Sequence, residues 1–261
     1  PAVTVHSGGV RRRGGVPGCA RLRPPVRGGS PTGRSARPSA SAPPVIAMRR
    51  RLARLAVVGV ADLPQRCPDL WQRATRHEFL DAVQDGTLPE AAFDRWLTQD
   101  YRFVALLLRF QARLLARSPR PAQSVLAGGV VALVDELAWF ERQAQARGLE
   151  LAVAELPATT AYARLLERLD GAEFPVALTA LWALERVYLD AWSHAAPGAP
   201  AYREFVEHWT TPAFADYVTG LAQAADAALR DIPEPADLDA SFRQVVEAEV
   251  SFWDMAWTQQ G

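Results

Sequence analysis

The sequence contains no lysine and only two cysteines, Cys19 and Cys67, in 261 residues. Two cysteines cannot build the disulfide framework of a small secreted domain, so we expect a reducing, cytoplasmic setting. Uninterrupted apolar runs are short, and none approaches the ~18–20 residues of a membrane-spanning helix, so no membrane association is expected. Strand signals are also missing, because no segment combines alternating polarity with β-branched residues. These absences favour an all-α protein.

The formal net charge of zero hides two segments of opposite charge. Residues 1–54 contain twelve Arg and no acidic residue, whereas residues 55–261 carry 17 Arg and all 29 acidic residues, a net charge of about −12. An acidic body offers no footprint for nucleic acid. Because Gly, Pro, Ser and Arg cannot build a core, we expect residues 1–54 to be a leader that is either disordered or not part of the native chain, whose true start would then be Met48 or a later position. A signal or transit peptide and an Arg-rich nucleic-acid tail are the alternatives.

From Pro68 onward the sequence predicts a single all-α domain of seven to eight helices within residues 55–261. Proline suits the first turn of a helix, and Gly148 marks a helix end. Gly128-Gly129, inside one predicted helix, indicates close helix packing or a kink. The predicted helices cover residues 68–84, 88–117, 121–147, 158–169, 174–195, 200–209, 212–230 and 236–258.

Three acidic residues interrupt apolar helix faces. Asp100, Glu185 and Glu249 each belong to an i, i+3, i+4, i+7 apolar series, and an aromatic residue follows each of them three positions later. A carboxylate carried into a core costs several kcal/mol unless it is paired or its pKa shifts. We interpret the three acids as the polar part of a pocket that holds a flat nitrogen heterocycle between aromatic rings. The alternative is ion pairing with helix-borne arginines, namely Arg95, Arg186 or Arg243.

Buried carboxylates in a helical bundle also suggest a di-metal site, which uses Glu-x-x-His pairs from facing helices. No His follows any of the three acids at this spacing, so we expect no metal or other cofactor, and a metal-dependent oxidase is the weaker alternative. Asp190 and His194 lie four residues apart and are interpreted as a surface pair. Cys67 precedes a helix start, where the helix dipole could lower the pKa of its thiol, but we expect an inert boundary residue.

Two stretches about 150 residues apart carry a resemblance to a known family. The first comprises His77-Glu78-Phe79, Gly86-Thr87-Leu88-Pro89, Phe93 and Gln99-Asp100-Tyr101, and the second is the run Glu249-Val250-Ser251-Phe252-Trp253-Asp254-Met255-Ala256-Trp257. Over residues 63–258 the sequence resembles the TenA (thiaminase II) family. The resemblance implies a haem-oxygenase-like all-helical fold, a homo-oligomer (dimer or tetramer) and a cofactor-free enzyme of thiamin salvage that releases hydroxymethylpyrimidine.

The resemblance also implies roles for individual residues. Asp100 corresponds to the acid that binds the aminopyrimidine, and Glu249 corresponds to the acid/base glutamate of the family. Tyr162 resembles the tyrosine that lines the site. Phe103 and Trp209 stand where many members have Tyr, so the stacking surfaces are kept and two hydroxyl groups are lost.

The cysteine nucleophile of typical members is missing, because its helix contains Glu185 and Tyr188 instead. This arrangement resembles a branch of the family that carries Glu in place of Cys. It predicts hydrolysis of an aminomethyl- or formylaminomethyl-pyrimidine, with Glu185 and Glu249 activating water and handling protons. Asp100 would bind the ring, while Tyr188 and Tyr162 orient the substrate or leaving group. Two Glu in one pocket should titrate as a coupled pair with at least one raised pKa. A non-catalytic pyrimidine-binding or regulatory protein of the same fold is the alternative.

Overall fold

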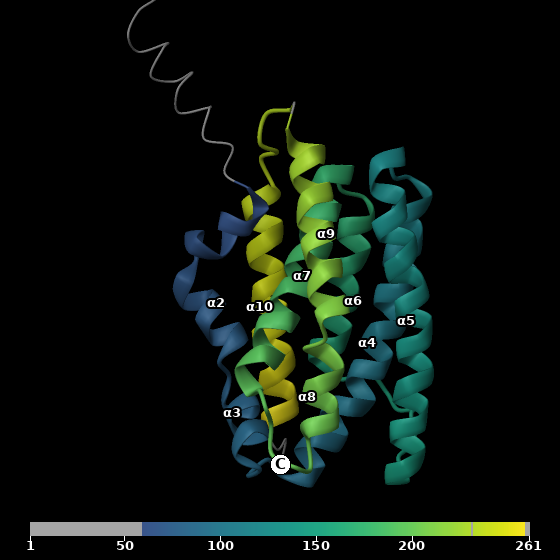
Figure 1. Ribbon diagram of the computed structural model, residues 1–261, viewed down its shortest axis with the longest axis vertical. Helices are drawn as coiled ribbons and strands as arrows, with labels where there is room; N and C mark the ends of the chain where they lie inside the picture. The colour runs from purple at the N-terminus through teal and green to yellow at the C-terminus, as the bar shows by residue number, and fades with distance from the viewer. Residues whose placement is uncertain (1–58, 231, 259–261) are drawn as a thin grey trace, which may run out of the picture. The chain divides into compact units, whose positions relative to one another are not determined.

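The computed structural model of this chain describes residues 59–230 and 232–258. Every regular element within these residues is a helix, as predicted (Figure 1). The expected leader, residues 1–54, lies outside the described residues. The elements are the 3-10 helix η1 Val60–Arg66 and the α-helices α2 Pro68–Thr75, α3 Glu78–Asp85, α4 Glu90–Ala116, α5 Arg120–Arg147, α6 Pro157–Asp170, α7 Phe174–Ala195, α8 Arg203–Trp209, α9 Pro212–Leu229 and α10 Leu238–Trp257.

The predicted boundaries agree with the structure within a few residues except at the start of the bundle. The single helix predicted over residues 68–84 is wrong, because α2 and α3 are separate helices. The break occurs where His77 caps α3: its Nδ1 accepts a hydrogen bond from the backbone N–H of Phe79 at 3.1 Å. The apolar pattern continues across this break, so periodicity alone does not show it.

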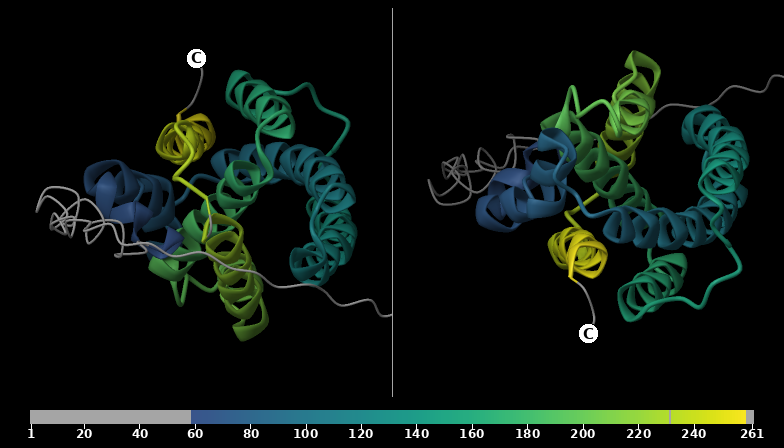
Figure 2. Two further views of the ribbon diagram at one scale, coloured as in Figure 1. Left: turned by 90° about the horizontal axis from the view of Figure 1, so that it is seen from above. Right: turned by 90° about the horizontal axis from the view of Figure 1, so that it is seen from below.

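Helix α7 forms the centre of the bundle and packs against α2, α3, α4, α6, α8, α9 and α10. Figure 2 shows it between the α2–α3 pair on one side and the α4–α5 pair on the other. All ten residues from Val176 to Glu185 are buried, which is the pattern of a helix surrounded by protein rather than of a surface helix. Glu185 is therefore carried inward by the most deeply buried element of the fold.

Helices α4 and α5 form an antiparallel hairpin beside this centre. At the open end, Asp94 Oδ1 accepts a hydrogen bond from Arg147 at 2.8 Å, and near the turn Gln111 Nε2 donates to the Leu126 carbonyl at 3.0 Å. The hairpin holds Asp100 on α4 and a run of α5 side chains against α7 and α9. It thus supplies one wall of the interior.

Helix α5 is the one helix in the described part of the chain that is long and apolar enough to cross a membrane by length and composition. A core helix passes the same test, and α5 packs along α4 and α9. Its inner face is buried at Leu126, Leu133 and Phe140, whereas Val131 and Val134 on the outer face are 62% and 52% exposed. Apolar side chains therefore cover both faces of this helix.

The glycine pair in α5 has two different environments. A Cβ on Gly129 would overlap the side chains of Gln111 and Tyr217, so close packing is confirmed at this position. At Gly128, which faces outward, a Cβ would meet no atom within 4 Å.

The two glycines should respond oppositely to alanine. Gly129→Ala must displace Gln111 or Tyr217 and should lower the free energy of unfolding by about 1–3 kcal/mol. Gly128→Ala adds helix propensity without a clash and should raise the free energy of unfolding by about 0.5–1 kcal/mol. Urea denaturation of the two variants beside the wild type measures both effects. Equal changes in the two variants would contradict the packing described for Gly129.

Candidate active site

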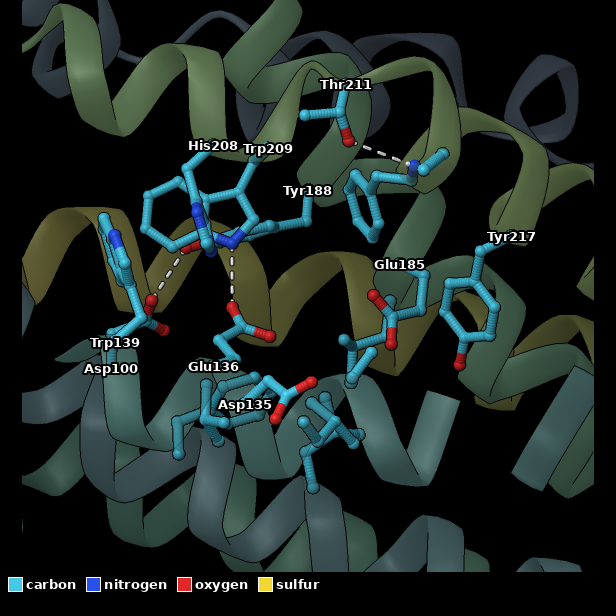
Figure 3. A pocket seen from close by; sticks show the side chains of 18 of the residues that line it. Asp100, Asp135, Glu136, Trp139, Glu185, Tyr188, His208, Trp209, Thr211 and Tyr217 are labelled. Atoms are coloured by element: carbon cyan, nitrogen blue, oxygen red, sulfur yellow. Dashed lines mark hydrogen bonds between the residues drawn. The ribbon is translucent and has the colours of Figure 1, made fainter. Parts of the chain in front are cut away.

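A cavity of about 420 Å³ lies between α4, α5, α7, α8 and α9. This volume falls in the range of about 300–1,000 Å³ that is usual for small-molecule sites. Its wall is largely aromatic and aliphatic, with a few carboxyl groups directed into it (Figure 3). Five of the residues expected at the site line this cavity: Asp100, Phe103, Glu185, Tyr188 and Trp209.

Two helices bring the expected acids and aromatic rings together. Asp100 and Phe103 are one turn apart on α4, and Glu185 and Tyr188 are one turn apart on α7, so each pair shares a helix face. Across the cavity wall, the Tyr188 hydroxyl donates a hydrogen bond to Asp100 Oδ2 at 2.7 Å. Burial raises the pKa of Asp100 well above its usual value, although the Tyr188 hydroxyl acts in the opposite direction.

Glu185 is 6% exposed and lines the cavity. Burial raises the pKa of its carboxyl to about 8, and the charges of Glu136 and Glu249 raise it further in the same direction. Within the described residues no side chain donates a hydrogen bond to it. A carboxyl group with this pKa and no protein partner can exchange a proton with a ligand near neutral pH.

Glu249 and Tyr162 lie in the adjacent core and do not line the cavity. The Tyr162 hydroxyl donates a hydrogen bond to Glu249 Oε2 at 3.3 Å, and the Tyr162 ring packs on Phe103 with a centroid distance of 4.5 Å. Burial raises the pKa of Glu249 to about 8, against the lowering effect of Tyr162. The charge of Glu249 is thus one cause of the raised pKa of Glu185, whereas burial is what raises the pKa of Glu249.

The expected alternative of Arg–carboxylate pairing is wrong for all three acids. Each candidate arginine has other partners within residues 59–230 and 232–258. Arg95 donates to the carbonyls of Met255 and Ala256, Arg186 pairs with Asp190, and Arg243 pairs with Asp239. Burial of the three acids is thus not offset by guanidinium groups.

The predicted surface pair of Asp190 and His194 is also wrong. Asp190 pairs with Arg186 at 2.9 Å, and His194 Nε2 lies 2.7 Å from Asp81 Oδ1 on α3. Among the residues that the structure describes, no group of three or more His, Cys, Asp or Glu is arranged to hold a metal ion. Cys67 is buried at the start of α2, and burial raises the pKa of its thiol.

Some of the motif residues have structural roles. Gln99 Oε1 accepts hydrogen bonds from the backbone N–H of Leu156 at 2.9 Å and from the Thr159 hydroxyl at 2.7 Å, which fixes the start of α6 beside α4. Trp253 Nε1 donates to the Ala74 carbonyl at 3.0 Å and ties α10 to α2. These two residues hold neighbouring helices together, and neither of them lines the cavity.

Glu136 on α5 is a cavity residue that was not predicted. Its Oε1 accepts a hydrogen bond from Trp209 Nε1 at 2.8 Å, and burial raises its pKa to about 7. The signal was present in the sequence, because Glu136 belongs to the apolar series Leu133, Leu137 and Phe140 and has Trp139 three positions later.

Aromatic rings fix the upper wall of the cavity around Trp209. Trp209 stacks on Trp192 with a centroid distance of 4.8 Å, and it contacts Trp139 and Tyr188 edge to face. His208 stacks on Trp139 at 4.0 Å, and burial lowers its pKa to about 4, so it is neutral in the physiological range. This wall presents flat surfaces at fixed positions.

An all-α bundle that directs several carboxyl groups into an aromatic cavity defines a small-molecule site of the kind that the sequence predicts. Sequence comparison places the chain in one family: the TENA/THI-4/PQQC family matches residues 65–259, and the chain belongs to it. The predicted membership is confirmed.

Individual relatives cover most of the chain. A probable bifunctional TENA-E protein from Glycine max is 33% identical over 72% of this chain and 88% of its own length. An aminopyrimidine aminohydrolase from Halalkalibacterium halodurans is 25% identical over 77% of this chain and 96% of its own length. The structure of a TenA homologue from Pyrococcus furiosus superposes with a TM-score of 0.72 and 28% identity, covering 76% of this chain and 98% of the other. The fold is accordingly the haem-oxygenase-like bundle that was expected.

The buried state of Glu185 should be visible in the pH dependence of stability. In the unfolded chain its carboxyl ionises near pH 4.5, whereas in the folded protein it keeps its proton until about pH 8. Between these values the folded state binds more protons, so the free energy of unfolding falls as the pH rises. Glu185→Gln cannot ionise and should gain stability relative to the wild type between pH 4.5 and 8, by at most about 5 kcal/mol.

Urea denaturation at pH 5 and at pH 8 measures this difference. Glu167→Gln, at an exposed position on α6, is the matched control and should show no such gain. A Glu185→Gln variant whose stability relative to the wild type is the same at both pH values would contradict the raised pKa.

Proposed function

We propose that this protein is a hydrolase of thiamin salvage that acts on an aminomethyl- or formylaminomethyl-pyrimidine and releases hydroxymethylpyrimidine. The observation that carries the proposal is the position of Glu185, a buried carboxyl without a protein partner in the described residues, on the wall of an aromatic cavity. The similarity to a relative named aminopyrimidine aminohydrolase supports the same reaction class.

The pyrimidine ring would lie between the aromatic walls that Phe103 and Trp209 provide. Asp100 would bind its amino and ring-nitrogen edge, because Tyr188 holds one carboxyl oxygen and leaves the other for the ligand. The exocyclic methylene group would then point toward Glu185. Tyr162 contributes indirectly, through its contacts with Phe103 and Glu249.

Glu185 would act as the general base that activates water. Its carboxylate takes a proton from the water molecule, whose oxygen bonds to the methylene carbon as the bond from that carbon to nitrogen breaks. An aminomethyl substrate enters with a protonated amine, so the nitrogen leaves as ammonia. The proton on Glu185 then passes to ammonia, which restores the carboxylate.

Glu249 would set the proton occupancy of this site. Its charge raises the pKa of Glu185, so that ionisation of one glutamate disfavours ionisation of the other. Near pH 8 the pair therefore holds one proton between its two members. This is the state in which one group can accept a proton while the other supplies one.

A product assay tests the proposed reaction. The protein is incubated separately with aminomethyl-pyrimidine, formylaminomethyl-pyrimidine and thiamin, and hydroxymethylpyrimidine, ammonia and formate are followed chromatographically. We expect turnover of an amine-type substrate and none of thiamin, because no cysteine lines the cavity in the described part of the chain. Glu249→Gln should lower kcat about 100-fold or more, whereas the exposed Glu247→Gln on the same helix should leave it unchanged.

Two results would change the proposal. Full activity of Glu249→Gln would remove its role in proton handling. Tight pyrimidine binding without turnover of any of the three compounds would favour a binding or regulatory protein of the same fold.

We also propose that the outer face of α5 packs against a second copy of the chain. Val131 and Val134 are exposed, and no charged residue occurs from Pro121 to Val134. A contiguous uncharged surface of this kind is typical of protein interfaces.

Size-exclusion chromatography with light scattering measures the assembly. The wild type should be a dimer or tetramer, and the double variant Val131→Glu, Val134→Glu should be a monomer with unchanged helix content. Ile232→Glu, at another exposed apolar residue, should not change the mass. A double variant that keeps the mass of the wild type would contradict an α5 interface.

A further inference from the structure

We propose that Glu136 binds the positively charged amine of the substrate and so gives the site a preference for an aminomethyl-pyrimidine over a neutral pyrimidine. This inference rests on the proposed function of the cavity and deepens it, because it selects one of the two substrate classes. The residue has no counterpart in the motifs that relate the chain to its family. The contacts of its carboxyl group carry the inference.

The carboxyl group of Glu136 is held rigidly at the cavity. Trp209 Nε1 donates to Oε1 at 2.8 Å, and Trp209 is itself fixed by stacking on Trp192. Within the described residues Oε2 accepts no hydrogen bond. Figure 3 shows the carboxyl groups of Glu136 and Glu185 directed into the same space from α5 and α7. One oxygen is thus fixed by the protein while the other remains for a ligand.

The charge in the cavity is unbalanced. Four carboxyl groups line it, and in the described part of the chain one lining side chain, Arg142, carries a fixed positive charge. His208 is neutral, because burial lowers its pKa to about 4. No arginine acts on Glu136: burial and the Trp209 hydrogen bond are the causes that set its pKa near 7. A proton or a cationic ligand must therefore supply the missing positive charge.

A protonated aminomethyl group fits this requirement. It offers three N–H donors and one positive charge, and a carboxylate forms with it a charge-assisted hydrogen bond about twice as strong as a neutral one. A formylamino group is neutral and offers a single N–H. Held by Glu136, the amine stays protonated until its bond to carbon breaks, and it then leaves as ammonia without needing another acid.

Binding measurements on Glu136→Gln separate this role from a structural one. The glutamine carbonyl still accepts the hydrogen bond from Trp209, so the cavity wall is kept while the charge is removed. The binding constants of aminomethyl-pyrimidine and of the neutral hydroxymethylpyrimidine are measured at pH 7.5 by rapid mixing, before turnover of the amine, through the fluorescence of Trp139 and Trp209 at the cavity. We expect about tenfold weaker binding of the amine and little change for the alcohol. The exposed Glu167→Gln should change neither.

The outcomes distinguish this inference from the proposed function. Suppose that the wild type binds both ligands, and that Glu136→Gln either weakens the binding of both equally or leaves the binding of both unchanged. Glu136 then does not recognise the amine, and the inference is overturned while the proposed function stands. If the wild type binds neither ligand, the proposed function fails and the inference fails with it. Steady-state kinetics provide a second test. We expect Glu136→Gln to raise KM for the aminomethyl substrate and to leave KM for the formylaminomethyl substrate unchanged.

Discussion

Burial of carboxyl groups away from arginine is the constraint on which the rest of this structure depends. A carboxylate in an apolar core is strongly disfavoured, and proteins usually offset its charge with a guanidinium or ammonium group. Here Arg95, Arg186 and Arg243 are bound elsewhere, and Asp100, Glu185 and Glu249 keep raised pKa values instead. Burial of these acids lowers the free energy of unfolding at neutral pH. The same burial gives the site carboxyl groups that keep their protons near neutral pH.

The aromatic residues make this arrangement possible. Trp192 and Trp253 are fully buried at the bundle centre, and Trp209 and Tyr188 continue the same packed cluster up to the cavity. Large rings bury extensive apolar surface, and two of the rings that border the cavity also donate hydrogen bonds to carboxyl oxygens. In both cases, Trp209 with Glu136 and Tyr188 with Asp100, an aromatic side chain donates a hydrogen bond to a carboxyl oxygen at the cavity. The aromatic cluster thus fixes both the shape of the cavity and the direction of its polar groups.

The sequence predicted the helices and three of the buried acids because both follow from periodicity. An acid in an apolar series with an aromatic residue three positions later identified Asp100, Glu185 and Glu249, and the same rule, applied to the helix over residues 121–147, would also have identified Glu136. Other features depend on contacts between distant residues. Whether Glu185 faces a cavity while Glu249 lies behind Phe103 depends on how α6, α7 and α10 pack, and the break between α2 and α3 depends on the cap at His77.

Direct titration of the buried carboxyl groups tests the central claim most clearly. Carbon-13 NMR of protein labelled at the glutamate side-chain carboxyl, with Glu185→Gln and Glu249→Gln used for assignment, follows each ionisation between pH 4 and pH 10. We predict that both resonances titrate near pH 8, and that removal of Glu249 lowers the pKa of Glu185. Titration of both groups near pH 4.5, unaffected by the neighbouring substitution, would contradict the buried, coupled pair.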